Sequence, residues 1–391
     1  MLCPYSLTTP GGVQGQVMGL ARELRRMGHE VRVLGPCDGA PPDTFVTPLG
    51  DSLPTAANGS IAPLAPDPSA SLRTIRVLKD EEFDILHLHE PLSPGPTFTS
   101  LVMQMAPIVA TFHAAGESAS YKYLNAPLKA FAAAIEHRVA VSKDAVLLAE
   151  RYLGGEYEIL PNGVEIERFA PVPDEPSSPR RAIFFCGRHE PRKGLEFLLK
   201  AHATLPDDVD LWIASDGPET DRLKREWAGD ARIQWLGRIT DVEKATRLRQ
   251  AAVFCAPSLG GESFGVVLIE AMAANTPIVA SALDGYMNVA THMIDSVLVE
   301  PGDVAALEAG LRRVLDDPRT AEDLVRAGAV RAREFSMSTL ARRYETIYRR
   351  VIANHDAVTT PHHRGRVHRW WSILTRLRAL ASNSIRRMLV K

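Results

Sequence analysis

The stretch GGESFGVVLIEAMA at Gly260–Ala273 follows the strand-like run Val253–Ala256 and places a glycine-containing turn before an apolar helix. It carries two glutamates, Glu262 on the turn and Glu270 within the helix. At about 3.6 residues per turn, Glu270 lies about two turns further along the same element. An unpaired carboxylate inside so apolar a run would be costly, and the paired hydroxyl groups of a ribose are a suitable partner for it.

A second stretch, CGRHEPRKG at Cys186–Gly194, follows the strand-like run Ala182–Phe185. It delivers three cations, Arg188, Arg192 and Lys193. Arginine grips a diphosphate with two parallel hydrogen bonds, and lysine adds a compact charge. Such a cluster is also usual in a solvated basic loop, but this one stands at the carboxyl end of a strand, where α/β proteins bind ligands. Cations for phosphates and carboxylates for hydroxyl groups together predict a sugar-nucleotide site.

Strand and helix signals alternate along two parts of the chain, which predicts an α/β fold with two doubly wound, Rossmann-like domains facing a cleft. Strands are expected in the first part at Met1–Pro4, Glu30–Leu34, Asp84–Leu88, Ile108–Phe112 and Arg138–Ser142. In the second part they are expected at Ala182–Phe185, Asp210–Ala214, Ile233–Leu236, Val253–Ala256, Pro277–Ala280 and Val297–Val299. The first strand is short for a central position, which predicts a true start upstream of Met1.

A proline-rich segment, APVPDEPSSP, separates the two parts and is typical of a linker. We therefore expect an N-terminal domain at 1–168, a linker at 169–180 and a second domain at 181–336 that binds the nucleotide sugar. A long amphipathic helix at 337–354 follows after the second core is complete, and a tail at 355–391 ends the sequence.

Two features of the first domain also point to the cleft. PGGV at Pro10–Val13 lies between a strand and a helix, so that Gly12 allows a phosphate to approach the backbone amides of a helix start. A plain turn has the same sequence. His113 follows IVATF at the carboxyl end of a strand, where it is suited to contact the transferred sugar or the acceptor. A lone histidine there is more often structural. His87 and His89 share one face of a strand but lack a nearby third ligand, so no metal site is predicted.

The composition is that of a soluble globular protein, with 45% hydrophobic and 24% charged residues among 391. The four cysteines form no CxxC pair, which favours a reducing compartment, the cytoplasm, over a disulfide framework or a structural zinc. No apolar run approaches the roughly 20 residues of a spanning helix.

The end of the chain is basic. From Ala357 onward there are eight Lys and Arg and no acidic residue; removing these eight from 45 basic residues leaves 37 against 47 acidic ones, a net charge of −10 for the rest. Residues 364–391 alternate arginine with large apolar groups and include two tryptophans. This pattern is typical of a basic amphipathic helix on an anionic membrane surface. A disordered tail or a partner-binding helix is the alternative, and nucleic acid is the weaker candidate.

These motifs resemble a known family. GRHEPRKG, GGESFGVVLIEAMA, PGGV and LPNGV at Leu160–Val164 are similar to glycosyltransferase family 4, whose members are retaining enzymes of GT-B fold. Within it CPYS, PGGVQ, GHEVRVLGP, NGS, HLHEP, IVATFH and CAPSLGGESFG look most similar to actinobacterial phosphatidylinositol mannosyltransferases. The resemblance runs from residue 1 to about residue 353.

The resemblance implies a role for each matching residue. Arg188 and Lys193 would bind the donor diphosphate, Glu262 the donor sugar and Glu270 the ribose. Gly12 and the backbone amides of Ser263, Phe264 and Gly265 would border the diphosphate. The backbone at Arg238–Ile239 would meet the base, and His113 would lie at the reaction centre. The resemblance further implies a GDP-mannose or related donor, no metal or other cofactor, and a helix at 337–353 that crosses back to the first domain.

The acceptor half departs from the pattern. The mannosyltransferases carry basic residues after NGS and basic or polar residues after the ATFH histidine, whereas this chain has Pro63 and Ala65, then Ala114 and Glu117. We therefore expect mannose or another hexose to be moved to a lipid or polyol acceptor by a peripheral protein at the cytoplasmic face of the plasma membrane. A family 4 enzyme with another sugar or a soluble acceptor, and a non-catalytic membrane-associated GT-B protein, stay open as alternatives.

Overall fold

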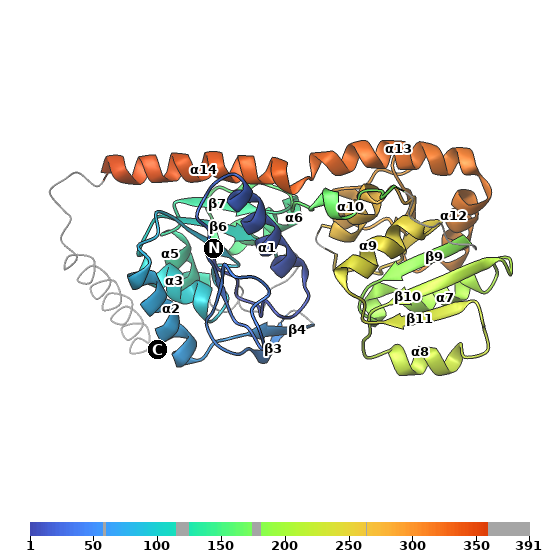
Figure 1. The fold of residues 1–391 in the computed structure, drawn as a ribbon, viewed down its shortest axis with the longest axis horizontal. Coiled ribbons are helices and arrows are strands. Elements are labelled where there is room, and N and C mark those ends of the chain that lie inside the picture. Colours follow the sequence, from blue (N-terminus) through green and yellow to red (C-terminus); the bar gives the residue numbers. More distant parts are fainter. Residues whose placement is uncertain (58–59, 115–124, 174–180, 263, 359–391) are drawn as a thin grey trace, which may run out of the picture. The chain divides into compact units, whose positions relative to one another are not determined.

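The structure is a computed structural model that describes residues 1–57, 60–114, 125–173, 181–262 and 264–358, and it divides into two compact units (Figure 1). The first unit is Met1–Leu160 with the segment from Ala341 onward, and the second is Pro161–Leu340. Residues 161–168, which the sequence assigned to the first domain, belong to the second. The Val164 N–H donates to the Phe335 carbonyl and the Met337 N–H donates to the Val164 carbonyl, both at 2.8 Å. Part of the expected linker, 174–180, lies outside the described residues.

The first unit is built on a parallel sheet. One part pairs β1 (Val33–Gly35) with β2 (Val46–Pro48), and the other has the order β5 (Leu86–His89), β6 (Ile108–Phe112), β7 (His137–Ala140) and β8 (Glu158–Ile159). Leu2 joins the two parts through parallel bridges to Leu34 and Leu88.

The strand expected at Met1–Pro4 is therefore only one bridging residue long, and that prediction is wrong in its extent. Pro4 has no N–H to continue a ladder, and Tyr5 already pairs with Leu64 on a different strand. Leu2, which is fully buried, nevertheless lies at the centre of the sheet, between β1 and β5, as predicted for this segment.

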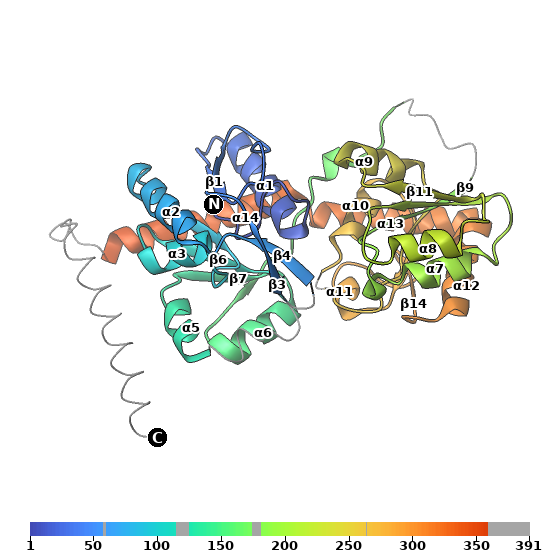
Figure 2. The same ribbon diagram turned by 90° about the horizontal axis from the view of Figure 1, so that it is seen from below.

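Helices cover this sheet. They are α1 (Gly12–Arg26), α2 (Pro68–Asp80), α3 (Pro96–Met103), α5 (Asn125–Ala132) and α6 (Lys143–Leu153). In Figure 2, α5 and α6 lie on one side of β6 and β7, and α1 lies on the other. The Asp67 carboxylate accepts hydrogen bonds from the first backbone amides of α2. The Ser142 hydroxyl accepts one from the Ala145 N–H at the start of α6.

Strands β2 and β8 were not predicted, nor was a further pair of strands in the first unit. β3 (Leu53–Ala57) and β4 (Ser60–Leu64) form an antiparallel pair with Pro54 opposite Pro63. Two prolines and three alanines give these segments little β-propensity, so the sequence offers no clear strand signal there.

The second unit has a six-stranded parallel sheet. Its order is β11 (Ile233–Gly237), β10 (Val209–Ala214), β9 (Arg181–Cys186), β12 (Val253–Ala256), β13 (Ile278–Ser281) and β14 (Val297–Val299). The chain first builds outward from β9 and then returns to add β12 on its other side. The sheet therefore reverses its direction of growth between β9 and β12, and a doubly wound sheet binds ligands beyond the carboxyl ends of the strands at such a reversal.

Both faces of this sheet are covered, which explains the uninterrupted apolar strands. Along β9, Phe184 packs in one buried cluster with residues of α9 (Asp241–Gln250) and α10 (Val266–Ala273). Ile183 and Phe185 pack in a second cluster with residues of α7 (Leu195–His202), α8 (Thr220–Glu226) and α12 (Val304–Asp316). Helices α11 (Asp284–Met287) and α13 (Pro318–Glu334) complete the unit.

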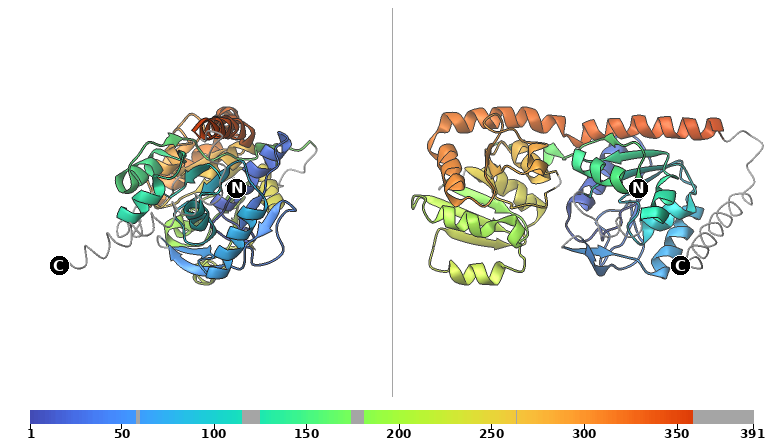
Figure 3. Two further views of the ribbon diagram at one scale, coloured as in Figure 1. Left: turned by 90° about the vertical axis from the view of Figure 1, so that its left-hand side faces the viewer. Right: turned by 180° about the vertical axis from the view of Figure 1, so that it is seen from behind.

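Helix α14 (Met337–Val358) returns to the first unit, as predicted, and runs along it (Figure 3). The Tyr344 hydroxyl lies 2.8 Å from the Thr111 hydroxyl, and the Tyr348 hydroxyl lies 2.6 Å from Nδ1 of His87. No helix in the described part of the chain is both long and apolar enough to cross a membrane. The basic segment 364–391 lies outside the described residues.

Gly194 shapes the loop between β9 and α7. It adopts a left-handed conformation with φ +67° directly after the short 3-10 turn Pro191–Lys193, and a Cβ atom there would meet the carbonyl oxygen of Pro257. A side chain at this position is therefore excluded by both the backbone conformation and the neighbouring strand end.

We expect Gly194→Ala to destabilise the protein by about 2 kcal/mol or more, since left-handed backbone alone costs an alanine about 1–2 kcal/mol. Thermal and urea unfolding of Gly194→Ala and of a control variant measure the change in stability. Gly229→Ala is the matched control, because a Cβ there meets nothing within 4 Å. Equal unfolding curves for the two variants would contradict this account of the turn.

Candidate active site

Two loops meet beyond the carboxyl ends of β9 and β12, where the second sheet reverses. The loop after β9 carries Arg188, Arg192 and Lys193, and the loop after β12 carries Glu262. The Leu259 N–H donates to the Arg192 carbonyl at 2.7 Å and ties one loop to the other. The structure thus brings together the two sequence stretches that were predicted to share a ligand.

Glu262 is the meeting point of these loops. Its Oε1 accepts from Nζ of Lys193 at 2.5 Å, from Nη1 of Arg192 at 3.3 Å and from the Ser258 hydroxyl at 3.2 Å. Only 12% of the side chain is exposed. The Ser258 hydroxyl also lies 3.0 Å from the hydroxyl of Tyr286, which supports it from behind. The carboxylate is thus held in one orientation before any ligand is bound.

Glu190, which was not predicted as a site residue, lies among the three cations. Its carboxylate pairs with Nε of Arg188 at 3.3 Å and with Nε of Arg192 at 2.9 Å. Three cations against Glu190 and Glu262 leave a net charge of +1 in the cluster. Three cations close together in sequence repel one another, so the glutamate between them in CGRHEPRKG was the signal that could have indicated an acidic partner.

Glu270 has a protein partner that the sequence argument did not name. Its Oε1 accepts from Nζ of Lys244 at 2.8 Å, and this lysine reaches it from α9. Burial works to lower the pKa of Lys244, but the attraction and hydrogen bond of Glu270, together with smaller contributions from Cys186 and Asp241, raise the pKa above its usual value. Lys244 also lies over the ring of Phe169, 5.4 Å from its centroid. The carboxylate inside the apolar helix is therefore neutralised within the fold.

Of the described residues just before α10, Phe264 and Gly265 place no polar side chain at the helix start. The Phe264 side chain is buried against Phe335, with ring centroids 5.6 Å apart, and Gly265 caps the helix with φ +84°. A Cβ on Gly265 would lie 2.8 Å from the Tyr286 ring. Ser263 lies outside the described residues. Ile239 follows β11 and packs against the core, and Arg238 beside it pairs with Asp216 at 2.8 Å.

The predicted residues of the first unit lie at the same end of their sheet as one another. Gly12 begins α1, and a Cβ there would meet nothing within 4 Å. His113 directly follows β6 and is mostly buried. Its Nε2 lies 2.9 Å from Nδ1 of His89, and Glu90 Oε1 accepts from the amides of His113 and Ala114 at 2.5 and 2.6 Å. Burial raises the pKa of Glu90 to about 7, although these two N–H groups lower it.

The predicted acceptor residues are apolar where the structure describes them. Ala65 is fully buried, and the Pro63 carbonyl accepts from the Ser6 N–H at 2.9 Å. Glu117 lies outside the described residues. Among the described residues no group of three or more His, Cys, Asp or Glu side chains is arranged to hold a metal ion.

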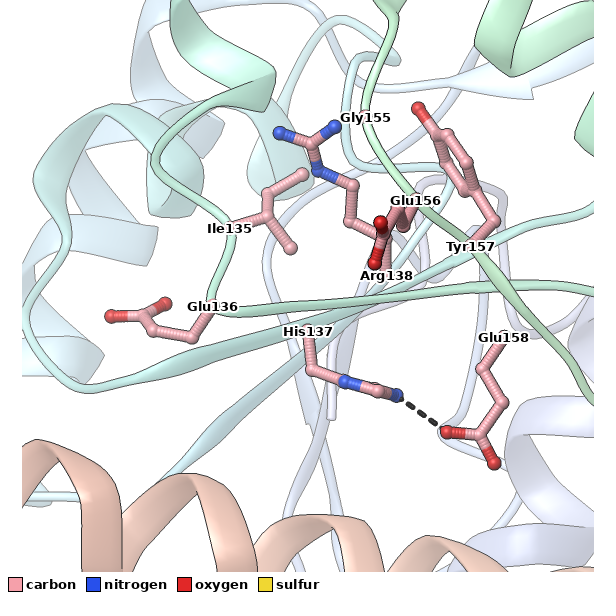
Figure 4. Close-up of a pocket in the computed structure, with 8 residues that line it drawn as sticks. All are labelled: Ile135, Glu136, His137, Arg138, Gly155, Glu156, Tyr157 and Glu158. Carbon is pink, nitrogen blue, oxygen red and sulfur yellow. Dashed lines mark hydrogen bonds and ion pairs between the residues drawn. The ribbon is translucent and has the colours of Figure 1, made fainter.

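An open pocket of about 580 Å³ lies elsewhere on the first unit, lined by residues 135–138 and 155–158 (Figure 4). These residues begin β7 and β8, so the pocket is at the opposite end of the parallel strands from His113. His137 Nε2 lies 2.9 Å from Glu158 Oε2 across it. None of the predicted site residues lines this pocket.

Comparisons with known proteins agree with this architecture. The family "Glycosyltransferase Family 4" matches residues 10–168, and "Glycosyl transferases group 1" matches residues 180–317. The phosphatidyl-myo-inositol mannosyltransferase of Mycobacterium leprae is 39% identical over 92% of this chain and 98% of its own length. That of Propionibacterium freudenreichii is 33% identical over 82% of this chain and 86% of its own length.

Solved structures show the fold. A sucrose-phosphate synthase from Thermosynechococcus elongatus has a TM-score of 0.70 and 23% identity, covering 88% of this chain and 94% of its own. Anabaena HepE in complex with UDP and glucose has a TM-score of 0.68 and 17% identity, covering 88% and 97%. Together with the parallel sheets of both units, these matches confirm the GT-B fold. By its sequence relatives, the chain belongs to glycosyltransferase family 4 and is similar over most of its length to the phosphatidyl-myo-inositol mannosyltransferases.

Proposed function

We propose that this chain transfers a hexose, mannose in the first instance, from a nucleoside-diphosphate sugar to a lipid or polyol acceptor, with retention of configuration and without a metal ion. The contact between Glu262 and Lys193 supports this proposal most directly. It joins a carboxylate suited to sugar hydroxyls to cations suited to a diphosphate, at the point where a doubly wound sheet binds its ligand. The names of the relatives point to mannose and to an inositol lipid.

The electrostatics of the cluster suit a departing diphosphate. When the bond between the anomeric carbon and the phosphate oxygen breaks, negative charge develops on the leaving group. Arg188, Arg192 and Lys193 are already held in place by Glu190 and Glu262, so little reorganisation is needed to meet that charge. Each charged hydrogen bond contributes about 1.5–3 kcal/mol. In this proposal the cations do the work that a metal does in other transferases.

Retention follows if the acceptor attacks from the face that the leaving group vacates. The acceptor oxygen forms the new bond to the anomeric carbon, and its proton passes to the departing phosphate oxygen, which leaves as a nucleoside diphosphate. No protein carboxylate then forms a covalent bond to the sugar. Glu262 binds sugar hydroxyls, Glu270 with Lys244 faces the ribose, and His113 meets the sugar or the acceptor at the reaction centre.

We expect Lys193→Met to lower kcat for sugar transfer about 10²–10³-fold, because one preorganised partner of the developing charge is lost. Glu262→Gln should abolish most turnover of the nucleotide sugar while the nucleoside diphosphate alone binds as tightly or more tightly, since Lys193 and Arg192 lose a neutralising neighbour. Calorimetry with GDP and GDP-mannose, together with transfer assays, measures both effects.

Glu308→Gln serves as the control, because within the described part of the chain this glutamate forms an ion pair only with Arg312, on the surface of α12. Equal losses of GDP and GDP-mannose affinity in Glu262→Gln would contradict a sugar-binding role. If the unaltered chain binds no nucleotide sugar, the proposed transfer is refuted and the non-catalytic GT-B protein is favoured.

Transfer by protein treated with EDTA and then freed of it should proceed within about twofold of the untreated rate, because the cationic side chains supply the compensating charge. Added Mg²⁺ or Mn²⁺ should not restore or raise it. A rate that falls with EDTA and returns with one of these ions would overturn the metal-free proposal.

The basic segment 364–391 would bring the enzyme to an anionic membrane surface, where each Lys or Arg adds about 1 kcal/mol of attraction. We expect the full chain to co-sediment with phosphatidylglycerol vesicles and a version ending at Val358, which keeps α14 whole, to pellet much less. Neutral phosphatidylcholine vesicles and high salt are the controls. Equal pelleting of the two proteins would refute this role.

A further inference from the structure

His113 is held by a second histidine that the fold encloses completely. His89 lies at the end of β5, beside β6, and its side chain has no exposed surface. Its Nδ1 is 2.9 Å from Nε2 of His113, and the two rings stack with centroids 5.2 Å apart and an interplanar angle of 22°. A ring-to-ring hydrogen bond of this length fixes both the direction and the tilt of the outer imidazole.

His89 itself has little freedom to move. The ring of His87 lies behind it with centroids 4.2 Å apart, and the next ring in the stack, Tyr344 of α14, is 4.8 Å from His87. His87 is anchored at both nitrogens, Nε2 at 2.7 Å from the Thr111 hydroxyl and Nδ1 at 2.6 Å from the Tyr348 hydroxyl. His113 therefore lies against a stack of fixed rings that extends from β5 to α14.

The residue after His89 fixes the backbone of the same histidine. Glu90 adopts a left-handed conformation with φ +48°, and its carboxylate accepts from the His113 and Ala114 amides. Two consecutive residues of β5 and its following loop thus hold His113, one by its ring and one by its main chain. The His113 side chain is therefore held in one orientation by restraints on both its ring and its main chain.

The bond between the rings also selects a tautomer. Burial lowers the pKa of His89 well below 6.5, so the ring is neutral and carries one N–H. Its Nε2 is buried without a hydrogen-bond partner among the described residues, whereas its Nδ1 faces His113. A buried N–H group without an acceptor is rarer than a buried acceptor without a donor. The proton therefore belongs on Nδ1 of His89, which donates to Nε2 of His113.

We propose that His89 is a positioning residue for the transfer reaction: it occupies Nε2 of His113 as a donor, so that neutral His113 carries its own proton on Nδ1 and meets the ligand as a hydrogen-bond donor. This inference rests on the proposed function, in which His113 lies at the reaction centre. A donor there suits a sugar hydroxyl or phosphate oxygen. It leaves removal of the acceptor proton to the departing phosphate.

Kinetics of three variants test the positioning role. His89→Phe keeps a ring in the stack but removes the donor, and we expect kcat to fall about 10–100-fold with the donor KM little changed, the size of effect that a misplaced reacting group produces. His89→Asn places an amide N–H near the position of Nδ1 and should recover most of this loss.

His87→Phe is the matched control. It alters a neighbouring ring on the same face of β5 and removes two hydrogen bonds, so its melting temperature should fall at least as far as that of His89→Phe. It leaves the His89 donor and a ring in the stack in place, so its kcat should fall much less than that of His89→Phe. Equal kcat values for the two phenylalanine variants would reduce His89 to a structural role and overturn the proposal.

The tautomer can be read without activity. In the full chain labelled with ¹⁵N-histidine, and with His113 assigned from a His113→Gln variant, we expect a protonated Nδ1 and an unprotonated Nε2. His89→Phe should give a mixture of tautomers, and His87→Phe should leave the signals unchanged. A protonated Nε2 in the unaltered protein would refute the inference. If the protein turns over no nucleotide sugar, the proposed function fails while these spectra still decide the tautomer.

Discussion

The ion pair between Lys193 and Glu262 is the contact on which the donor half of this protein depends. It spans two loops that are 69 residues apart in the chain and adjacent only because β9 and β12 are neighbours at the reversal of the sheet. Burying either charge in a half-buried position without the other would destabilise the fold, because an isolated charge there loses hydration without compensation. Together they keep a cation and a carboxylate within reach of one ligand. The order of strands in the sheet is therefore as necessary for this pair of charges as the residue types are.

The same principle appears in the first unit without an ion pair. His113 needs no counter-ion, because a neutral ring behind it and a carboxylate beneath its main chain hold it. Both holders come from the adjacent strand end, in the sequence HLHE. Each unit therefore positions its candidate reactive side chain in part with residues that follow the neighbouring parallel strand. In each case the restraint is a short hydrogen bond in a region with little water, where such bonds are strong.

Much of this arrangement was accessible from sequence because apolar runs that end in polar or glycine residues mark strand ends. β6 and β12 coincide with the predicted Ile108–Phe112 and Val253–Ala256. The periodicity of apolar residues indicates which face of a segment is buried, but not which distant side chain that face contacts. For this reason Lys244 of α9, the partner of Glu270, was not predicted. Glu190 was overlooked beside three cations, and the β3–β4 pair has too many prolines to be recognised as strands.

Helix α14 has a consequence for how the protein is made. Thr111 and His87 obtain their buried partners from Tyr344 and Tyr348, which follow them by 233 and 261 residues. During synthesis the first unit emerges from the ribosome early but lacks these partners until α14 has followed. The second unit, which is continuous in sequence from Pro161 to Leu340, has its strands and core complete before then. The part of the chain that is translated first is therefore the part whose core closes last, and the apolar surface that α14 later covers is exposed to chaperones in that interval.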